Sequence, residues 1–410
     1  MKRFNEFLTE ADANLHMTHL EDAVIDGGVK GTRNVINYLR ALRDMLGGNT
    51  KAPVSLTTKW DGAPAIFAGV DPADGKFFVA KKGVFNKNPK FYKTNAEIDN
   101  DLSGDLNSKF KVALAEFSKL GIEGVVQGDF LYTNDDLKTE NIDGEPHITF
   151  HPNTIVYAVP KSSDLGKKIS GSKIGVVWHT TYSGSTLETM SASFGMAIST
   201  KLTKVKNVWH VDATFEDKSG SATMTKAETD NLTAMLSKAG TLFRGVDATI
   251  LNELGTNEEL NTRINTFINS KVRDGQRIGA TGPFVSDLQK YIQQYYQKEA
   301  DKRKTPAGKK TQMDKAAAVL KIFDKKNTRK LVQIFTLYDL LVDMKYIIID
   351  KLNTVGGIRT LLKTTKGFEV TGQEGFVAID HYGKNALKIV DRMGFSQANF
   401  SDKYIKGWQK

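Results

Sequence analysis

Apolar residues recur every three or four positions in two stretches of the chain, the spacing that places them on one face of a helix. The first stretch spans 31–48 and predicts an amphipathic helix that Gly47 and Gly48 can end. The second runs from about 222 to 354, where nearly every segment has this spacing. The predicted buried faces are Val35, Ile36, Leu39, Leu42 and Leu46 in the first stretch, and Leu331, Ile334, Leu337, Leu341, Met344 and Ile348 in the second.

Between and after these helical stretches the pattern is that of strands. From 52 to about 215, short runs rich in β-branched and aromatic residues alternate with clusters of Gly, Asn, Asp and Pro, and similar runs return after the helices. Strands that are interrupted by helices and then resume predict one α+β domain with antiparallel sheets and a large all-α insertion. The predicted boundaries are 1–50 for an N-terminal helical segment, 51–220 and 361–410 for the two parts of the β-rich domain, and 221–360 for the insertion.

Composition and charge exclude several kinds of site and favour one kind of partner. The 410 residues include no cysteine, which excludes disulfides, thiolate catalysis and cysteine zinc sites. Every apolar run is shorter than the roughly 18 residues of a membrane-spanning helix, and the first residues lack a signal-peptide core, so we expect a cytoplasmic protein without a membrane partner. The net charge of +10 favours a polyanionic partner.

The segment LTTKWDGAPAIFAG (56–69) places a lysine, an aspartate and a glycine in a break between two apolar runs. The chain has no G-x-x-x-x-G-K-[ST], G-x-G-x-x-G or H-E-x-x-H motif, so phosphate chemistry would need another device. A lysine amine becomes a nucleophile when burial or nearby positive charge lowers its pKa, and it can then attack phosphorus. Lys59 is therefore a candidate nucleophile, Gly62 would let a ligand approach, and Asp61 would orient a ribose or a neighbouring base. A solvated turn is the alternative.

Further charged residues follow Lys59 in a definite order. Each stands beside an apolar run: Lys81 in FVAKKGVF, Asp129 in VVQGDFLY, Glu374 in QEGFVAI and Lys388 in NALKIVD. This order resembles the covalent nucleotidyltransferase superfamily, which contains the ATP-dependent RNA and DNA ligases and the mRNA capping enzymes. The motifs of that family run K-x-D-G, S-R-x-G, a G-E pair after a strand, an aromatic strand, E-G-x-V and K-x-K. The matching segments cover about 52–160 and 368–400.

The resemblance implies that Lys59 attacks the α-phosphate of ATP and becomes a lysyl-adenylate while pyrophosphate leaves. Lys388, with Lys81 or Lys384, would offset the phosphate charge and help keep Lys59 neutral. Two positions depart from the family pattern. Lys81 replaces an arginine, so it would act as a point charge, and Ala386 replaces the first lysine of K-x-K, which leaves Lys384 as its substitute.

The resemblance also implies the contacts to the nucleotide and to a metal. Tyr157 of the strand TIVYAV would pack on the base, beside Asp61 and Gly62 of the first motif. Glu374 and Asp129 would hold Mg²⁺ or Mn²⁺, although Asp129 is one methylene shorter than the family's glutamate. The expected cofactors are therefore ATP and a divalent cation.

The expected partner is a nucleic-acid end, RNA or DNA, bound by a monomeric protein. Only 22 residues follow Lys388, too few for the oligonucleotide-binding barrel of capping enzymes and most DNA ligases, which favours an RNA-ligase-like arrangement with the inserted helices holding the substrate. Between Asp301 and Leu331, eleven Lys or Arg against three Asp give a local charge of +8. A solvated helix face is the alternative there. The candidate phosphate contacts are Lys302, Arg303, Lys304, Lys309 and Lys310.

Two other classes of function stay open. The departures from the motifs would suit a non-catalytic nucleic-acid-binding protein of the same fold. A phage structural or packaging-associated protein is the second class. The segment HMTHLEDAVIDGGVKGT (16–32) resembles tailed-bacteriophage proteins, which indicates a source, and hence the host cytoplasm, but not a chemistry. His147, His151 and His179 are expected in the core or at the surface and not as ligands.

Overall fold

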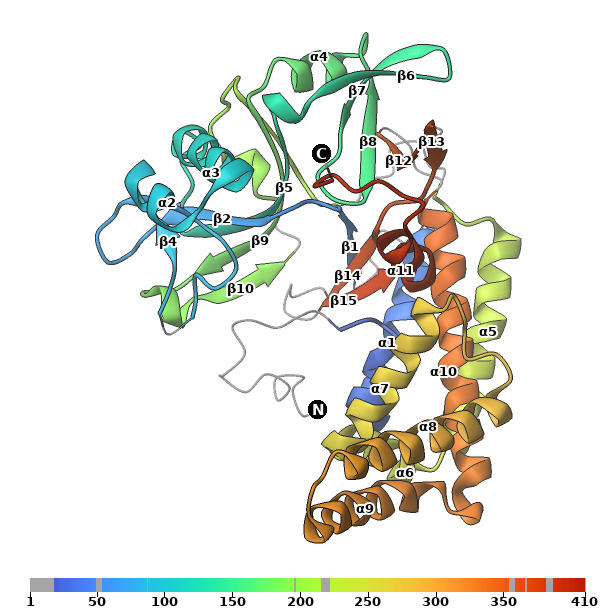
Figure 1. The fold of residues 1–410 in the computed structure, drawn as a ribbon. Helices are drawn as coiled ribbons and strands as arrows, with labels where there is room; N and C mark the ends of the chain where they lie inside the picture. Colours follow the sequence, from blue (N-terminus) through green and yellow to red (C-terminus); the bar gives the residue numbers. More distant parts are fainter. Residues whose placement is uncertain are drawn as a thin grey trace.

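The fold is mixed α+β with largely antiparallel sheets, as the sequence pattern predicts (Figure 1). A strand-rich half occupies the upper part of the view, a helical body the lower right, and a small sheet lies between them. The computed structural model describes residues 18–48, 54–86, 88–194, 197–214, 222–353, 358–365, 367–380 and 386–409.

The sheet between the two halves joins strands that are far apart in the sequence. β1 (Val54–Lys59) pairs antiparallel with β14 (Gly375–Asp380), which pairs antiparallel with β15 (Ala386–Val390). The register places Lys59 opposite Gly375 and Lys388 opposite Val377. The first and last of the predicted motifs therefore meet in one sheet.

A second sheet has seven strands, in the order β10-β9-β5-β2-β3-β4, with β11 parallel to β9. Helix α3 packs on it through Phe110 and Phe117, and α2 through Ile98, in one apolar cluster with Ile66 and Trp178. The sequence pattern did not predict these helices; α2 begins at a capping box made by Thr94. The bounds are β2 (Ala65–Val70), β3 (Phe77–Ala80), β4 (Phe91–Tyr92), α2 (Asn95–Asp101), α3 (Gly104–Phe117), β5 (Val125–Thr133), β9 (Ile174–Ser183), β10 (Ser191–Phe194) and β11 (Val208–Asp212).

A third sheet, of five strands, runs in the order β13-β12-β8-β7-β6. Asp143 and Gly144 both have positive φ and form the two-residue turn of the β6–β7 hairpin. β12 pairs antiparallel with β8 although the helical segments separate them, so the helices interrupt one β structure. The bounds are β6 (Lys138–Ile142), β7 (Glu145–Phe150), β8 (Ile155–Pro160), α4 (Asp164–Ser170), β12 (Arg359–Thr364) and β13 (Gly367–Val370).

The helical body includes the first described helix as well as the helices of the insertion. α1 packs against α5, α6 and α10, and its Leu39 shares one apolar core with Leu341 of α10 and with Leu56 and Phe376 of the central sheet. The N-terminal helix and the insertion are therefore one packed unit, not two. The bounds are α1 (Asp22–Leu46), α5 (Lys226–Gly245), α6 (Ala248–Thr256), α7 (Glu258–Arg273), α8 (Thr281–Asp301), α9 (Pro306–Leu320), α10 (Lys325–Leu352) and α11 (Arg392–Phe400), which lies on α7.

Candidate active site

Lys59 ends β1 and is in ionic contact with Glu374, which immediately precedes β14. The contact follows from the strand register, because Lys59 pairs with Gly375, the neighbour of Glu374. The Lys59 side chain is about one quarter exposed, at 26 %, whereas that of Glu374 is 9 % exposed. The amine is thus reachable from solvent while its carboxylate partner is buried.

Two carboxyl groups beside Lys59 have strongly raised pKa values. Burial raises the pKa of Asp129 to about 7, an effect that the charge of Lys59 opposes and that of Asp61 reinforces. Burial likewise raises the pKa of Glu374 to about 7, again against the charge of Lys59. The two carboxyl groups also repel each other, since Asp129 raises the pKa of Glu374.

Lys388 brings a second positive charge close to Lys59. It lies in β15 opposite Val377, and its side chain is partly buried. Burial lowers the pKa of Lys388, and the charge of Lys59 lowers it further, whereas Glu374 raises it. We call Lys59, Asp129, Glu374 and Lys388 the Lys59 cluster.

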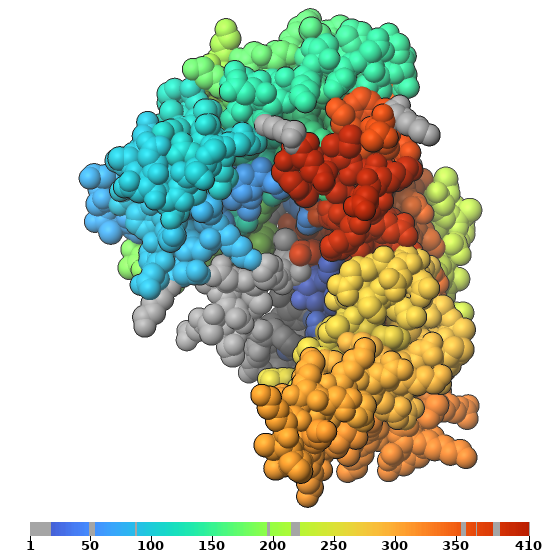
Figure 2. Space-filling model, viewed as in Figure 1, coloured from blue at the N-terminus to red at the C-terminus, as the bar shows by residue number. Residues whose placement is uncertain are grey.

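The Lys59 cluster lies at the boundary between the two halves of the molecule. Three of its residues belong to β1, β15 and the start of β14, which occupy that boundary in Figure 1. Figure 2 shows a hollow there, between the surface of the light-blue and cyan residues and that of the red C-terminal residues. A separate cavity of about 360 Å³ lies by the five-stranded sheet, and none of the Lys59 cluster is among its described lining residues.

Asp61 is turned into the protein and not toward a ligand. Its carboxylate accepts hydrogen bonds from Asn153 Nδ2 at 2.6 Å and from the backbone N–H groups of Thr154 and Ile155 at 2.7 Å each. Only 2 % of the residue is exposed, and burial raises its pKa. The expected ribose contact is therefore replaced by a structural role, in which Asp61 fixes the turn after Lys59 to the start of β8.

Gly62 and Tyr157 also contact protein atoms around the turn that follows Lys59. A Cβ on Gly62 would lie 2.6 Å from Asp129 Cβ and 2.9 Å from Phe130 O, so the close approach is to β5 and not to a nucleotide. Tyr157 is fully buried and stacks on Phe150, and its hydroxyl accepts a hydrogen bond from Asp61 N at 2.7 Å. The expected packing of Tyr157 on a base is wrong, because both ring faces lie in the core.

His179, which the sequence pattern assigned to the core or the surface, lies near enough to Lys59 to feel its charge. In the pairing of β5 with β9, Gln127 lies opposite Thr180 and Gly128 opposite Trp178, which makes His179 the extra residue of a β-bulge. Its Nδ1 is 2.7 Å from Thr180 Oγ1. Burial lowers the pKa of His179 to about 4, and the charge of Lys59 adds to this, so the imidazole beside the cluster is neutral at pH 7. The sequence pattern could not predict that His179 lies near Lys59, because strand alternation does not locate a β-bulge.

Lys81 and Lys384 are the other two lysines that the resemblance places at the phosphates. Lys81 Nζ lies 3.6 Å from Asp101 of α2, so its charge is paired away from the cluster. The adjacent Lys82 is instead near enough to lower the pKa of Lys388. Lys384 lies outside the described residues.

One family model matches residues 14–404, that of the family of unknown function DUF6267. The chain belongs to this family. Comparison with curated proteins and with solved structures gave no match. The DUF6267 match includes the whole Lys59 cluster and every helix of the helical body.

Two findings on this DUF6267 chain bear on its ligands and surroundings. Within the described ranges, no group of three or more His, Cys, Asp or Glu side chains is arranged to hold a metal ion. No helix in the part of the chain that the structure describes is both long and apolar enough to cross a bilayer.

The candidate phosphate contacts lie on the outside of the helical body. Their side chains are exposed around the α8–α9 connection and along α9. Lys302 is paired with Glu299 at 2.5 Å, and Lys330, another residue of the basic stretch, is paired with Asp247 at 2.8 Å. Part of the local charge is thus already neutralised within the helices. The five candidates are Lys302, Arg303, Lys304, Lys309 and Lys310.

Proposed function

We propose that the protein is an ATP-dependent polynucleotide ligase that acts on RNA or DNA through a covalent lysyl-AMP intermediate on Lys59. The observation that carries this proposal is the Lys59 cluster, which the chain assembles from separate segments in the order of the nucleotidyltransferase motifs. We also propose that residues 51–220 and 361–410 have the nucleotidyltransferase fold. The antiparallel sheets on both sides of the helices support this.

In the proposed first step, Lys59 Nζ forms a bond to the α-phosphorus of ATP while the bond from that phosphorus to the pyrophosphate oxygen breaks. Lys59 must lose a proton before its lone pair can attack. Glu374 is in contact with Nζ, and a pKa of about 7 makes it a better proton acceptor than an ordinary glutamate. We therefore assign this proton to the Glu374 carboxylate. The products are a phosphoramidate on Lys59 and pyrophosphate.

The other members of the cluster would stabilise the negative charge of the phosphates. Lys388 places a partly buried positive charge beside Lys59, where fixed charge acts strongly on a transition state. Asp129 is an oxygen donor that would suit Mg²⁺, and Glu374 would be a second one only while it is ionised, before it takes the Lys59 proton; such a cation completes its coordination with waters and substrate phosphates. A bound divalent cation would supply further neutralisation of phosphate charge.

In the proposed later steps, AMP passes from Lys59 to a 5′-phosphate end, and a 3′-hydroxyl then displaces AMP to join the strands. The exposed basic residues of α8 and α9 support binding of the polynucleotide by the helical body. We propose that this surface holds the substrate, whereas the Lys59 cluster carries out the adenylation.

The test is covalent labelling with ATP that carries the label on its α-phosphate. We expect label on Lys59, dependent on a divalent metal, and complete loss in Lys59→Arg. Arginine keeps the charge that faces Glu374 but stays protonated, so it cannot attack phosphorus. The matched control is Lys90→Arg, because Lys90 is also paired with a carboxylate, that of Asp101 at 2.7 Å, and should label like the wild type.

Mass spectrometry that finds AMP on another residue, or label that survives Lys59→Arg, would rule out this assignment. A wild-type protein that binds nucleic acid but never takes the label would be a non-catalytic binding protein. Recovery of an unlabelled protein in purified phage particles would favour a structural role.

A further inference from the structure

The backbone of Lys388 is held from its outer side by residues 18–20. Lys388 N donates a hydrogen bond to Thr18 O at 3.0 Å, and Leu20 N donates one to Lys388 O at 2.9 Å. His19 and Lys388 thereby form a parallel bridge. Without this contact β15 would be the free edge of the central sheet, where pairing is least constrained.

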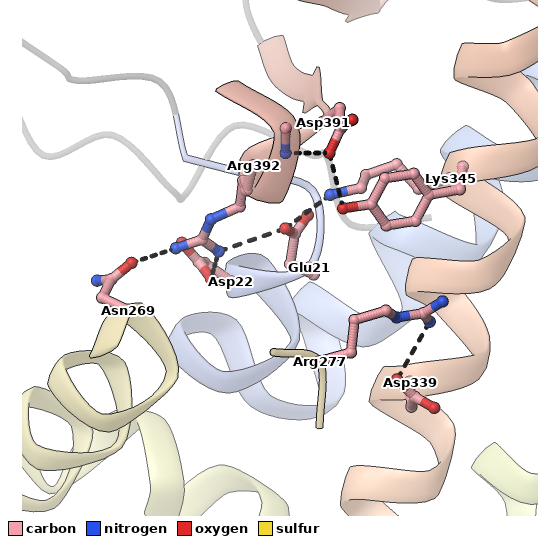
Figure 3. A network of polar contacts seen from close by, with 10 residues as sticks. Glu21, Asp22, Asn269, Arg277, Asp339, Lys345, Asp391 and Arg392 are labelled. Atoms are coloured by element: carbon pink, nitrogen blue, oxygen red, sulfur yellow. Dashed lines mark hydrogen bonds and ion pairs between the residues drawn. The ribbon is translucent and has the colours of Figure 1, made fainter. Parts of the chain in front are cut away.

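A buried charge network fixes this N-terminal segment immediately after the bridge. Glu21 Oε1 accepts a hydrogen bond from Lys345 Nζ at 2.8 Å and one from Arg392 Nη1 at 3.3 Å. Figure 3 shows the Glu21, Lys345 and Arg392 side chains pointing toward one another from the N-terminal segment, α10 and α11. The Lys345 and Glu21 side chains are 1 % and 3 % exposed.

Arg392 extends the network in two more directions. It donates to Asp22 Oδ1 at 2.6 Å and to Asn269 Oδ1 of α7 at 2.5 Å. Because Arg392 follows Lys388 by four residues, the network closes a ring from β15 through α11 and Glu21 back to the bridge. Lys345 ties the same ring to the longest helix of the helical body.

The electrostatics of Glu21 favour its ionised form in this network. Burial alone would raise the pKa of Glu21, but the charges of Lys345 and Arg392 outweigh burial and lower the pKa to about 2. A buried carboxylate with two buried cationic partners is costly to disturb, since loss of one charge leaves the others unpaired. His19 Nδ1 and Glu21 Oε2 are also buried, without a described hydrogen-bond partner.

We propose that Glu21, through Lys345 and Arg392, is a positioning residue that holds Lys388 beside Lys59 and couples the helical body to adenylation. The proposal rests on the proposed function. Glu21 acts on the backbone that carries Lys388 and does not touch the nucleotide. A displacement of about 1 Å in a charge that stabilises a transition state can cost about 100-fold in rate.

The first test does not need activity. Amide hydrogen exchange of Glu21→Gln should be at least about tenfold faster at Leu20 and Lys388, with the β1–β14 amides unchanged. Lys345→Met removes one cationic partner of Glu21 and keeps the other, Arg392, so the same change in exchange should be smaller. This variant replaces Glu21→Gln in the test if Glu21→Gln does not fold. The matched control is Asp71→Asn, which removes another buried carboxylate paired with a lysine, Lys93 at 2.6 Å, far from β15 in the chain.

The second test separates positioning from general destabilisation. Glu21→Gln should slow single-turnover formation of the Lys59 adenylate by about 10- to 100-fold while the KM for ATP changes less than about threefold. In a Lys388→Ala background the same substitution should have less than about a twofold effect, because the residue through which it acts is gone.

Unchanged exchange at Leu20 and Lys388 would overturn the proposed clamp whether or not the protein is a ligase. Rate losses that multiply in the double variant would also overturn it, by showing that Glu21 does not act through Lys388. Altered exchange in a wild-type protein that never forms the adenylate would instead remove the proposed function and, with it, any role of Glu21 in adenylation.

Discussion

At the scale of single residues, the raised pKa values of Asp129 and Glu374 predict how stability changes with pH. In the unfolded chain these groups lose their protons near their ordinary pKa values of 3.8 and 4.5, whereas the folded protein keeps them to about pH 7. Between these limits the folded state keeps protons that the unfolded chain has lost, so the contribution of these two groups to the free energy of unfolding should fall as pH rises from about 4 to about 7.

Asp129→Asn should remove part of this pH dependence. An amide cannot ionise, so the variant should be similar to the wild type near pH 4 and more stable by about 1–2 kcal/mol near pH 8. Urea unfolding across this pH range measures the difference. The exposed Asp135→Asn should leave the slope unchanged, and a parallel pair of curves for wild type and Asp129→Asn would contradict the assigned pKa.

Gly62 offers a steric prediction beside Lys59, the proposed nucleophile. Gly62→Ala places a Cβ 2.6 Å from Asp129 Cβ, so the turn must move away from β5. We expect a loss of about 1–3 kcal/mol in the free energy of unfolding and strongly reduced labelling of Lys59. Gly27→Ala is the control, because its Cβ would have no atom within 4 Å, and it should stay within about 1 kcal/mol of the wild type. If Gly62→Ala and Gly27→Ala have the same free energy of unfolding and the same labelling of Lys59, the steric argument is wrong.

The sequence predicted which residues stand near one another better than which way they face. The order of the motifs predicts that Lys59, Lys81, Asp129, Glu374 and Lys388 line one cleft. Four of them lie together at the boundary between the halves, whereas Lys81 is paired with Asp101 of α2. The direction in which a side chain faces was not predictable. Asp61 lies inward because Asn153, Thr154 and Ile155, 92 or more positions away, supply its hydrogen bonds. Tyr157 lies inward because its ring packs between Trp60 and Phe150.

At the scale of elements, α8 and α9 carry the prediction for nucleic-acid binding. Neutralising Lys302, Arg303, Lys304, Lys309 and Lys310 together should weaken ligation while leaving the Lys59 adenylate nearly unchanged. Each lost phosphate contact should reduce the slope of log affinity against log salt by about 0.7 on single strands. Lys302, already paired with Glu299, should contribute least.

The control for this surface is an equal number of exposed lysines on the strand-rich half. Neutralising Lys161, Lys167, Lys168, Lys204 and Lys206 should leave the affinity and its salt slope unchanged. If the two sets of substitutions have the same effect, net charge alone governs binding. If the α8–α9 set has no effect, that face is only solvated.

Long periodic helices were predictable and short capped ones were not. Leu331, Leu341 and Ile348 of α10 are fully buried, as their spacing predicts. The helices α2, α3 and α4 were not predicted, because each is only 7 to 14 residues long and lies between strands in the sequence. Nor could periodicity show that α1 packs with the insertion, since an apolar face does not identify its partner.

At the scale of the whole molecule, the separate apolar cores predict unfolding in more than one step. The helical body and central sheet share one core, whereas Trp60, Trp178 and Trp209 lie in clusters of the strand-rich half. Leu39→Ala, in the fully buried face of α1, should cost about 2–5 kcal/mol in the helical core. Circular dichroism at the helix band should shift to lower denaturant more than tryptophan fluorescence does. Coincident shifts of both probes would show a single cooperative unit.

The pairing of Glu21 with Arg392 can form only late in protein synthesis. The two residues are 371 positions apart, so at about 5–20 residues per second on the order of 20 to 75 s pass between their appearance on the ribosome. Until then Lys345 is the only one of these two cationic partners that Glu21 can have, and before residues 386–390 are made β15 and its bridge to His19 cannot form. A nascent or truncated chain would therefore carry Lys59 without Glu374 and Lys388 beside it, and the proposed adenylation would begin only when translation is almost complete.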